Sequence, residues 1–430
     1  MFILSLFRTA WLSALLLLLL PNAHAQSVLL DLEQALQAAK TRSRQLVAQD
    51  PPASPARDMA QPAGQLPDPM LKAGIINLPI NGPDRFSLTQ DFMTARNIGF
   101  SQEFTRAGKR QARAARYERE AEAAEAGRQL ALANLRRDTA LAWLERHHQE
   151  RLRDVLRAQR AEAVLQIEAA EAAYRGGRGA QADVFAARTA VAQIDDRILQ
   201  ADRDIATAKT RGARWTAAEA PARQLAARPD LSLLGQIDAD NLHTHVAHHP
   251  QLALLARQED VARAEADIAR SNKQADWSAE LMYSQRGPDY SNMISINFSV
   301  PLQIDQASRQ DRELTAKLAQ AEQARAERDE AQRGHLADAR AWLQTWQGNR
   351  ERLANYDRAL IPLAAERTRA AFAAYRGGAG SLAAVLDARR MEIGTHAERV
   401  RLGLETAALW ARLEYLIPPG QMATAALEQP

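Results

Sequence analysis

The chain has 430 residues and a formal net charge of +3 at pH 7, and 46% of its residues are hydrophobic but only 5% aromatic. Apolar content carried mainly by alanine and leucine favours long helices, and the interleaved charges provide no basic arm for nucleic acid. The lack of cysteine excludes disulfides, thiolate metal sites, cysteine nucleophiles and acylation on an N-terminal cysteine.

Residues 1–25 are predicted to be a secretory signal peptide. They combine one positive charge at Arg8, an apolar run over residues 10–20 and the small-residue tripeptide Ala23-His24-Ala25. The run is too short to span a bilayer, so we expect cleavage before Gln26 and export of the mature chain. An uncleaved N-terminal anchor is the alternative. No later segment reaches the ~18 uncharged apolar residues of a membrane helix.

Residues 26–67 are predicted to form a separate N-terminal segment of the exported chain. Prolines at positions 51, 52, 55, 62 and 67 are expected to interrupt a helix there, which leaves a bent or partly extended path.

Two β-hairpins are predicted, at residues 68–104 and 276–304. In the last segment Ile294, Ile296, Phe298 and Val300 alternate with polar residues, and "TARNIGFSQEF" places Ile98, Phe100 and Phe104 on one side. Each hairpin contains turn residues, Asn81-Gly82-Pro83-Asp84 in the first and Gly287-Pro288-Asp289 in the second. The sequence therefore predicts four strands that are apolar on one side only.

Two long helical hairpins are predicted to follow the strands, at residues 105–215 and 305–417. Each has a first helix of about 70 residues, ~105 Å long if continuous, a turn and a second helix of ~54 Å. Apolar residues recur at helical spacing in the first long segment, at Leu141, Leu144, Leu152, Val155 and Leu156. Residues 216–240 are predicted to form an irregular linker, residues 241–275 helices of the second repeat, and residues 418–430 a loose tail.

The turn of each hairpin carries the same sequence. "AAYRGGRGAQADVFAAR" begins at Ala172 and "AAYRGGAGSLAAVLDAR" begins at Ala373, an offset of 201 residues. The pairs Gly176-Gly177 and Gly377-Gly378 have the backbone freedom needed to end a helix and reverse the chain. The chain is therefore an internal repeat of strand hairpin and long helical hairpin.

The one-sided strands allow two interpretations. A soluble four-stranded sheet is one of them. The other is transmembrane β-strands, whose length of ~10 residues and alternating pattern match. Because single-chain bacterial barrels need at least ~8 strands, four strands could close a barrel only if several chains share it.

This order of elements resembles the TolC-like outer-membrane factor family. The resemblance implies a mainly α fold in which a homotrimer shares a twelve-stranded outer-membrane β-barrel that continues into a twelve-helix periplasmic tunnel. The segments "GQLPDP", "SLTQDFMTARNIGFSQEF" and "YSQRGPDYSNMISINFSVPL" are most similar to the heavy-metal cation-efflux (CzcC/CusC-type) branch. It also implies contact with outer-membrane lipid, a periplasmic adaptor (membrane fusion) protein and an inner-membrane resistance-nodulation-division pump that supplies the energy.

The resemblance places the two glycine turns at the periplasmic tip, where adaptors dock and the pore is gated. Asp183, Tyr375 and Asp387 match family positions in the gate. Ala384 replaces an expected aspartate, and Gly380 stands where an arginine is expected, with Arg376 nearby. The predicted tip and gate residues are Tyr174, Arg175, Gly176, Gly177, Asp183, Tyr375, Arg376, Gly377, Gly378 and Asp387.

The stretch "HTHVAHHP" is a weak candidate metal site, because His245 and His249 would lie one helical turn apart. Pro250 disfavours helix at His249, however, and no carboxylate motif accompanies the cluster. His147 and His148 are expected on a helix surface, and the tryptophans at 215, 342, 346 and 410 are expected to pack between helices.

Neither a phosphate loop nor a hydrolase or zincin motif is found, so no cofactor and no enzyme activity are expected. The function favoured by the sequence is a passive exit duct of a tripartite efflux system for heavy-metal cations. Alternatives are the same fold exporting drugs or secreted protein, a periplasmic adaptor, and a structural coiled coil.

Overall fold

The computed structural model describes residues 29–48, 55–216, 222–232, 234–235, 237 and 239–416, and this part is mainly helical. The predicted signal peptide and C-terminal tail lie outside these residues. The chain divides into unit 1 (Met1–Ser43, Leu135–Gln236 and Trp342–Tyr415) and unit 2 (Arg44–Asn134, Ile237–Ala341 and Leu416–Pro430). None of the helices in the described ranges is long and apolar enough to cross a membrane.

Unit 2 contains a four-stranded sheet and several helices. Its strands are β1 (Met70–Ile76), β2 (Ala95–Phe104), β3 (Trp277–Gln285) and β4 (Met293–Ser299). Its helices are α3 (Arg44–Ala48), α4 (Pro55–Ala63), α7 (Leu242–Ala247), α8 (Pro250–Ser271) and the first parts of α5 (Ala107–Arg175) and α9 (Gln310–Asn355). Helix α4 forms although Pro62 lies inside it. Pro62 is the last residue but one, so the missing N–H affects only the final turn.

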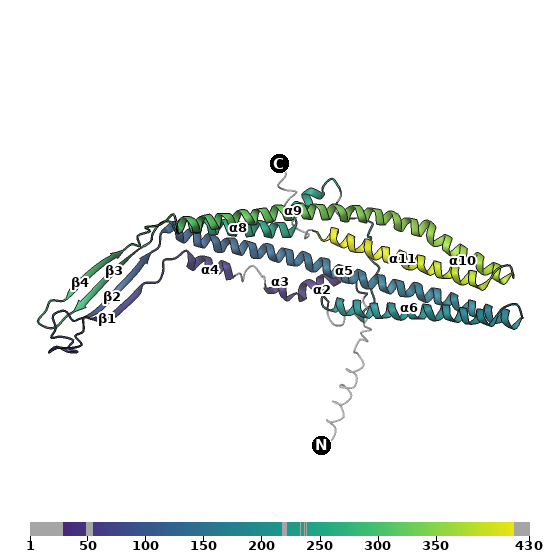
Figure 1. The fold of residues 1–430 in the computed structure, drawn as a ribbon, viewed down its shortest axis with the longest axis horizontal. Helices are drawn as coiled ribbons and strands as arrows, with labels where there is room; N and C mark the ends of the chain where they lie inside the picture. Colours follow the sequence, from purple (N-terminus) through teal and green to yellow (C-terminus); the bar gives the residue numbers. More distant parts are fainter. Residues whose placement is uncertain are drawn as a thin grey trace, which may run out of the picture. The chain divides into compact units, whose positions relative to one another are not determined.

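The sheet has the order β1-β2-β3-β4 with every neighbouring pair antiparallel, as Figure 1 shows. The register sets Leu71, Phe100, Leu281 and Ile296 in one row across the four strands. The next row on the same face holds Ala73, Ile98, Tyr283 and Ile294. Lys72 and Glu280 form an ion pair of 2.5 Å on the other face. The predicted alternation therefore sorts apolar and polar side chains onto opposite faces.

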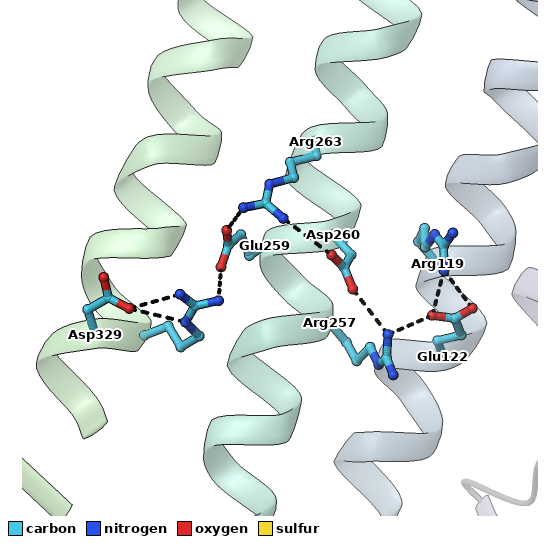
Figure 2. Close-up of polar contacts among 8 residues, drawn as sticks. Arg119, Glu122, Arg257, Glu259, Asp260, Arg263 and Asp329 are labelled. Atoms are coloured by element: carbon cyan, nitrogen blue, oxygen red, sulfur yellow. Dashed lines mark hydrogen bonds and ion pairs between the residues drawn. The ribbon is translucent and has the colours of Figure 1, made fainter. Parts of the chain in front are cut away.

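An alternating chain of charges joins three helices of unit 2 (Figure 2). Glu259 of α8 is only 1% exposed and pairs with Arg263 of its own helix and with Arg328 of α9, the latter at 2.6 Å. The chain continues through further ion pairs on α5, α8 and α9, which involve Arg119, Glu122, Arg257, Asp260 and Asp329. Buried charge in this bundle is thus compensated across helices.

Unit 1 consists of α2 (Leu32–Arg42) and two helical hairpins (Figure 1). The C-terminal part of α5 pairs with α6 (Gln181–Ala213), and α10 (Ile361–Arg376) pairs with α11 (Leu382–Glu414). One buried cluster joins the helices of unit 1 and contains Leu156 and Ala163 of α5, Ile194 and Ala201 of α6 and Ile393 of α11. The small side chains of the two alanines let these long helices pack closely.

The second long helix is interrupted, which the sequence analysis did not predict. A π-helical turn, η3 (Tyr356–Leu360), separates α9 from α10. Pro362 lies in the first turn of α10. It lacks the N–H for the carbonyl of Arg358, and its ring would clash with that carbonyl in a regular helix. The first repeat has Ala161 at the equivalent position, and α5 runs without a break.

Within unit 1, the irregular segment after α6 contacts the N-terminal residues next to α2. Leu30 and Leu225 form a parallel bridge, with the Leu30 N–H donating to Gln224 O at 2.8 Å. The Trp143 indole N–H donates to Leu30 O at 3.1 Å, and Arg146 donates to Arg223 O at 2.6 Å. Helix α5 thus binds the N-terminal segment through the carbonyl of Leu30 and the predicted linker through the carbonyl of Arg223.

Candidate functional site

The two glycine turns have the same backbone geometry. In the first, Gly177 N–H donates to Tyr174 O at 3.0 Å and Arg178 N–H donates to Ala173 O at 2.9 Å. This pair of bonds, with Gly177 at φ +71°, is a Schellman motif that satisfies the last carbonyls of α5. Gly177 is therefore the residue that needs left-handed backbone, whereas Gly176 has no positive φ.

The second turn repeats these contacts 201 residues later. Gly378 has φ +75° and donates to Tyr375 O at 3.1 Å, and the Ala379 N–H donates to Ala374 O at 2.9 Å. Gly377 is the C-cap of α10 with φ −78°. The repeated Tyr-Arg-Gly-Gly sequence thus encodes one local structure twice.

A third glycine belongs to each turn, and its role was not predicted from the sequence. A Cβ at Gly179 would lie 3.1 Å from the Ala173 Cβ, and a Cβ at Gly380 would lie 3.1 Å from the Ala374 Cβ. The chain passes so close to the preceding helix that a side chain there would make a contact tighter than ordinary van der Waals distance. Gly380 therefore suits the close approach of the chain to the preceding helix in this turn. The repeat of Gly-x-Gly at residues 177–179 and 378–380 was the available signal.

Asp183 and Ala384 differ because the two turns cap the next helix in different ways. In the first hairpin the Asp183 carboxylate accepts the N–H of Ala180 at 3.1 Å, and Ala180 itself has no capping side chain. In the second, the Ser381 hydroxyl oxygen accepts the Ala384 N–H at 3.3 Å. Each hairpin thus uses one half of a capping box.

The two predicted tyrosines are placed differently. Tyr174 is 48% exposed, whereas Tyr375 packs against a cluster of buried residues from both hairpins, Ala170, Val184, Ala187, Leu382 and Val385. The Tyr375 hydroxyl is buried and has no hydrogen-bond partner within the described residues. Burial, and then the nearby Asp183 charge, raise the pKa of Tyr375. The structure therefore brings Asp183 and Tyr375 into one environment.

The remaining predicted tip side chains do not join that environment. Arg175 and Arg376 are exposed. Asp387 is also exposed and pairs with Arg390 of its own helix at 2.5 Å. No contact links Asp387 to Tyr375 among the interactions of the described residues, so these two predicted gate positions are separate here.

A partly buried polar cluster around Arg389 was not predicted. Arg389 of α11 donates to Gln159 of α5 at 2.8 Å and pairs with Glu162 at 3.0 Å and with Glu392 at 3.2 Å. The equivalent residue of the first repeat, Arg188, pairs with Glu171 of α5 at 2.8 Å. The arginine that ends both quoted repeat sequences is thus the residue that ties its helix to α5.

The weak metal candidates have separate contacts. His245 lies in α7 with its Nδ1 2.9 Å from Asn241 O. His249 is the N-cap of α8, accepts the Gln251 N–H at 3.2 Å and stacks on His335 with ring centroids 4.4 Å apart. No group of three or more metal-ligating side chains occurs in the part of the chain that the structure describes.

His148 corrects an expectation, because it is buried and not on the helix surface. It is 6% exposed, and its Nδ1–H donates to Leu144 O at 2.8 Å. Burial is the main cause that lowers the pKa of His148 to about 4, and Arg228 and Arg399 also lower it. His148 is therefore neutral near pH 7, and only its long-range packing against α11 could have revealed this.

Comparisons with known proteins identify the fold. No family model and no curated protein sequence matches the chain. Among solved structures, the outer membrane protein VceC of Vibrio cholerae matches 90% of this chain and 95% of its own with a TM-score of 0.74 and 19% identity. The CmeC outer membrane channel of Campylobacter jejuni matches 92% and 88% of the two chains with a TM-score of 0.73 and 12% identity.

CusC, a transmembrane channel, matches 89% of this chain and 91% of its own with a TM-score of 0.69 and 14% identity. It does not stand apart from VceC or CmeC, so the heavy-metal branch is not distinguished by structure. The agreement over almost the full length of several chains carries one conclusion. This protein has the fold of the outer-membrane channels.

Proposed function

We propose that the protein is an outer-membrane exit duct, a homotrimer in which each chain contributes four strands to a twelve-stranded barrel and its long helices to a periplasmic tunnel. Its partners are a periplasmic adaptor and an inner-membrane resistance-nodulation-division pump. Transport through it is passive, with the energy supplied by the pump.

The observation that carries this proposal is the exposed apolar face of the sheet. Leu71, Phe100, Leu281 and Ile296 form one row, and they are 73%, 49%, 53% and 64% exposed. A sheet that faced water on this side would expose a large contiguous apolar patch, which is unusual for a soluble protein. Within the described residues the outer edges of β1 and β4 pair with no other strand, which favours pairing with further copies.

Membrane insertion is tested by placing a charge on each face of β4. Ile296→Lys puts a cation on the apolar face and is expected to cost about 2–4 kcal/mol if that position lies near the bilayer midplane. Asn297→Lys is the matched control on the polar face. We expect only Ile296→Lys to reduce sedimentation with outer membranes and heat-modifiable migration. If neither wild type nor control sediments with outer membranes, an adaptor or a structural coiled coil is the better interpretation.

Gating is proposed to act through the two turns, where Asp183 and Tyr375 share one environment. A ligand that binds better to an open arrangement shifts the population toward it. Asp183→Ala removes both the cap of α6 and the charge beside Tyr375, whereas Ser381→Ala removes only the equivalent cap of α11. We expect Asp183→Ala alone to raise single-channel conductance and sensitivity to large antibiotics. Equal behaviour of the two variants would reject this role.

The proposed cargo is heavy-metal cations, and it rests on the sequence resemblance to the cation-efflux branch. Drugs and secreted protein are the alternative cargoes. Deletion of the gene, followed by growth with zinc, cobalt, cadmium, copper or silver beside a panel of antibiotics, tests them together. Lost tolerance to metals alone supports the proposal, and lost tolerance to antibiotics alone contradicts it.

A further inference from the structure

A groove in unit 1 lies beside the π-helical turn, and no role has been assigned to it. It is bounded by α5, residues 228–232 of the linker, α9, η3 and α11, and has a volume of about 640 Å³. Small-molecule sites in proteins typically enclose ~300–1,000 Å³. The groove therefore has the size of a ligand site.

Cations outnumber carboxylates along the groove. It is lined by Arg228, Arg350, Arg358 and Arg399, against Asp230, Glu351 and Asp357. Several of these groups are already engaged. Arg399 Nε and Nη2 donate to the two oxygens of Asp357 at 3.0 and 2.9 Å, Arg358 Nε donates to Ala354 O at 3.2 Å, and Asp230 accepts the Ser232 N–H at 2.8 Å.

Two guanidinium groups keep donors without an acceptor. Arg228 is exposed and makes no ion pair or side-chain hydrogen bond within the described residues, although the charges of Asp230 and Asp357 lie near it. The bidentate contact of Arg399 with Asp357 uses its Nε and Nη2 and leaves Nη1 without a partner among those residues. Guanidinium donors of this kind bind carboxylate and phosphate groups with charge-assisted hydrogen bonds.

Gly403 lines the groove beside one of these donors, Nη1 of Arg399. A Cβ at this position would lie 3.4 Å from His148 Nε2 and 3.8 Å from Arg399 Nη1. His148 also lines the groove, donates its Nδ1–H to a carbonyl and is neutral, so it adds no charge to the site. A side chain at residue 403 would therefore come into van der Waals contact with His148 and with Nη1 of Arg399.

We propose that this groove binds a small anion bearing a carboxylate or phosphate group, held by Arg228 and by Nη1 of Arg399. The groove size favours a free small molecule over an acidic segment of a protein. The site is independent of whether the protein conducts substrates, so its test does not depend on channel activity.

Isothermal titration of the full-length protein in detergent, with citrate and with inorganic phosphate at constant chloride, tests the site. We expect saturable binding of at least one anion, with one ligand per chain. Arg228→Gln should weaken it at least tenfold. Arg333→Gln removes the same charge from a surface pair with Glu330, where the arginine is 71% exposed, and should leave binding unchanged.

A glycine pair in α11 separates ligand binding from folding. Gly403→Ala adds a methyl group 3.8 Å from Arg399 Nη1, whereas the methyl group of Gly394→Ala meets nothing beyond its own helix within 4 Å. Both changes favour helix, so both variants should fold. We expect weaker binding, by fivefold or more, for Gly403→Ala alone. Absence of saturable binding to either anion, or unchanged binding in Arg228→Gln and Gly403→Ala, would overturn the proposal.

Discussion

Buried Glu259 predicts an unequal response of its ion-pair network to mutation (Figure 2). The carboxylate side chain is 1% exposed, whereas its partners Arg263 and Arg328 are 56% and 31% exposed. When a partner is lost, an arginine can rehydrate but the carboxylate cannot. Removing both arginines, as Arg263→Met with Arg328→Met, should therefore cost about 3–5 kcal/mol, because it leaves a buried charge without compensation.

Removing the carboxylate should cost much less. Glu259→Leu keeps an apolar side chain of similar size and leaves two hydrated arginines, so we expect a change of about 1 kcal/mol or less. Adding Glu259→Leu to the double arginine variant should restore most of its stability. This recovery is a coupling that independent sites do not show.

The measurement is the loss of helical circular dichroism on heating in detergent at one scan rate, for wild type and the three variants. A loss of 3 kcal/mol corresponds to roughly 6–12 °C for a unit of 150–250 residues. The expected order is wild type close to Glu259→Leu, then the triple variant, with the double arginine variant lowest. If Glu259→Leu is as destabilised as the double variant, or if the triple variant shows no recovery, the reasoning is refuted.

Three further changes follow from local geometry. The pKa of His148 is about 4 in the folded chain, which is below its unfolded value. Its contribution of about 3 kcal/mol to the free energy of unfolding is therefore present above pH 6.5 and lost as the pH falls toward 4. His148→Gln should flatten the pH dependence of the melting temperature in this range. Gly177→Ala and Gly378→Ala place a side chain on left-handed backbone, and each should lower the free energy of unfolding by about 1–2 kcal/mol. Gly348→Ala lies in open space within α9 and should raise that free energy by up to ~1 kcal/mol. Unchanged melting temperatures of the two turn variants would contradict the left-handed geometry of the turns. Gly380→Ala should lower the melting temperature, because the new methyl group makes a tight contact with the end of α10. Faster hydrogen exchange of the α10 amides in this variant would show that the destabilisation is local to that helix.

Predictions from local sequence agree with the structure where the conformation of a short segment depends mainly on its own residues. Ile294, Ile296 and Phe298 lie on one face of β4, because successive side chains of a strand point to opposite faces. The glycine pairs end their helices through bonds that span six residues. Sequence also indicated the internal repeat, since the offset of 201 residues requires no knowledge of contacts.

The candidate site was only partly accessible in this way. Asp183 and Tyr375 are 192 residues apart in sequence, and the packing of two hairpins brings them into one environment. The same packing leaves Tyr174 exposed although its local sequence is almost identical to that of Tyr375. Local pattern therefore identified the turns but could not rank the side chains within them.

The sequence by itself determined the repeat, the strand faces and the turn geometry of this protein, because each depends on residues close together in the chain. Only the tertiary structure decided which charges and rings are buried. His148 faces Gly403, and Glu259 meets Arg328 on a neighbouring helix. The sequence around such residues does not differ in kind from the sequence around surface residues of a helix. The cost of burying them is offset by partners that folding brings from distant segments.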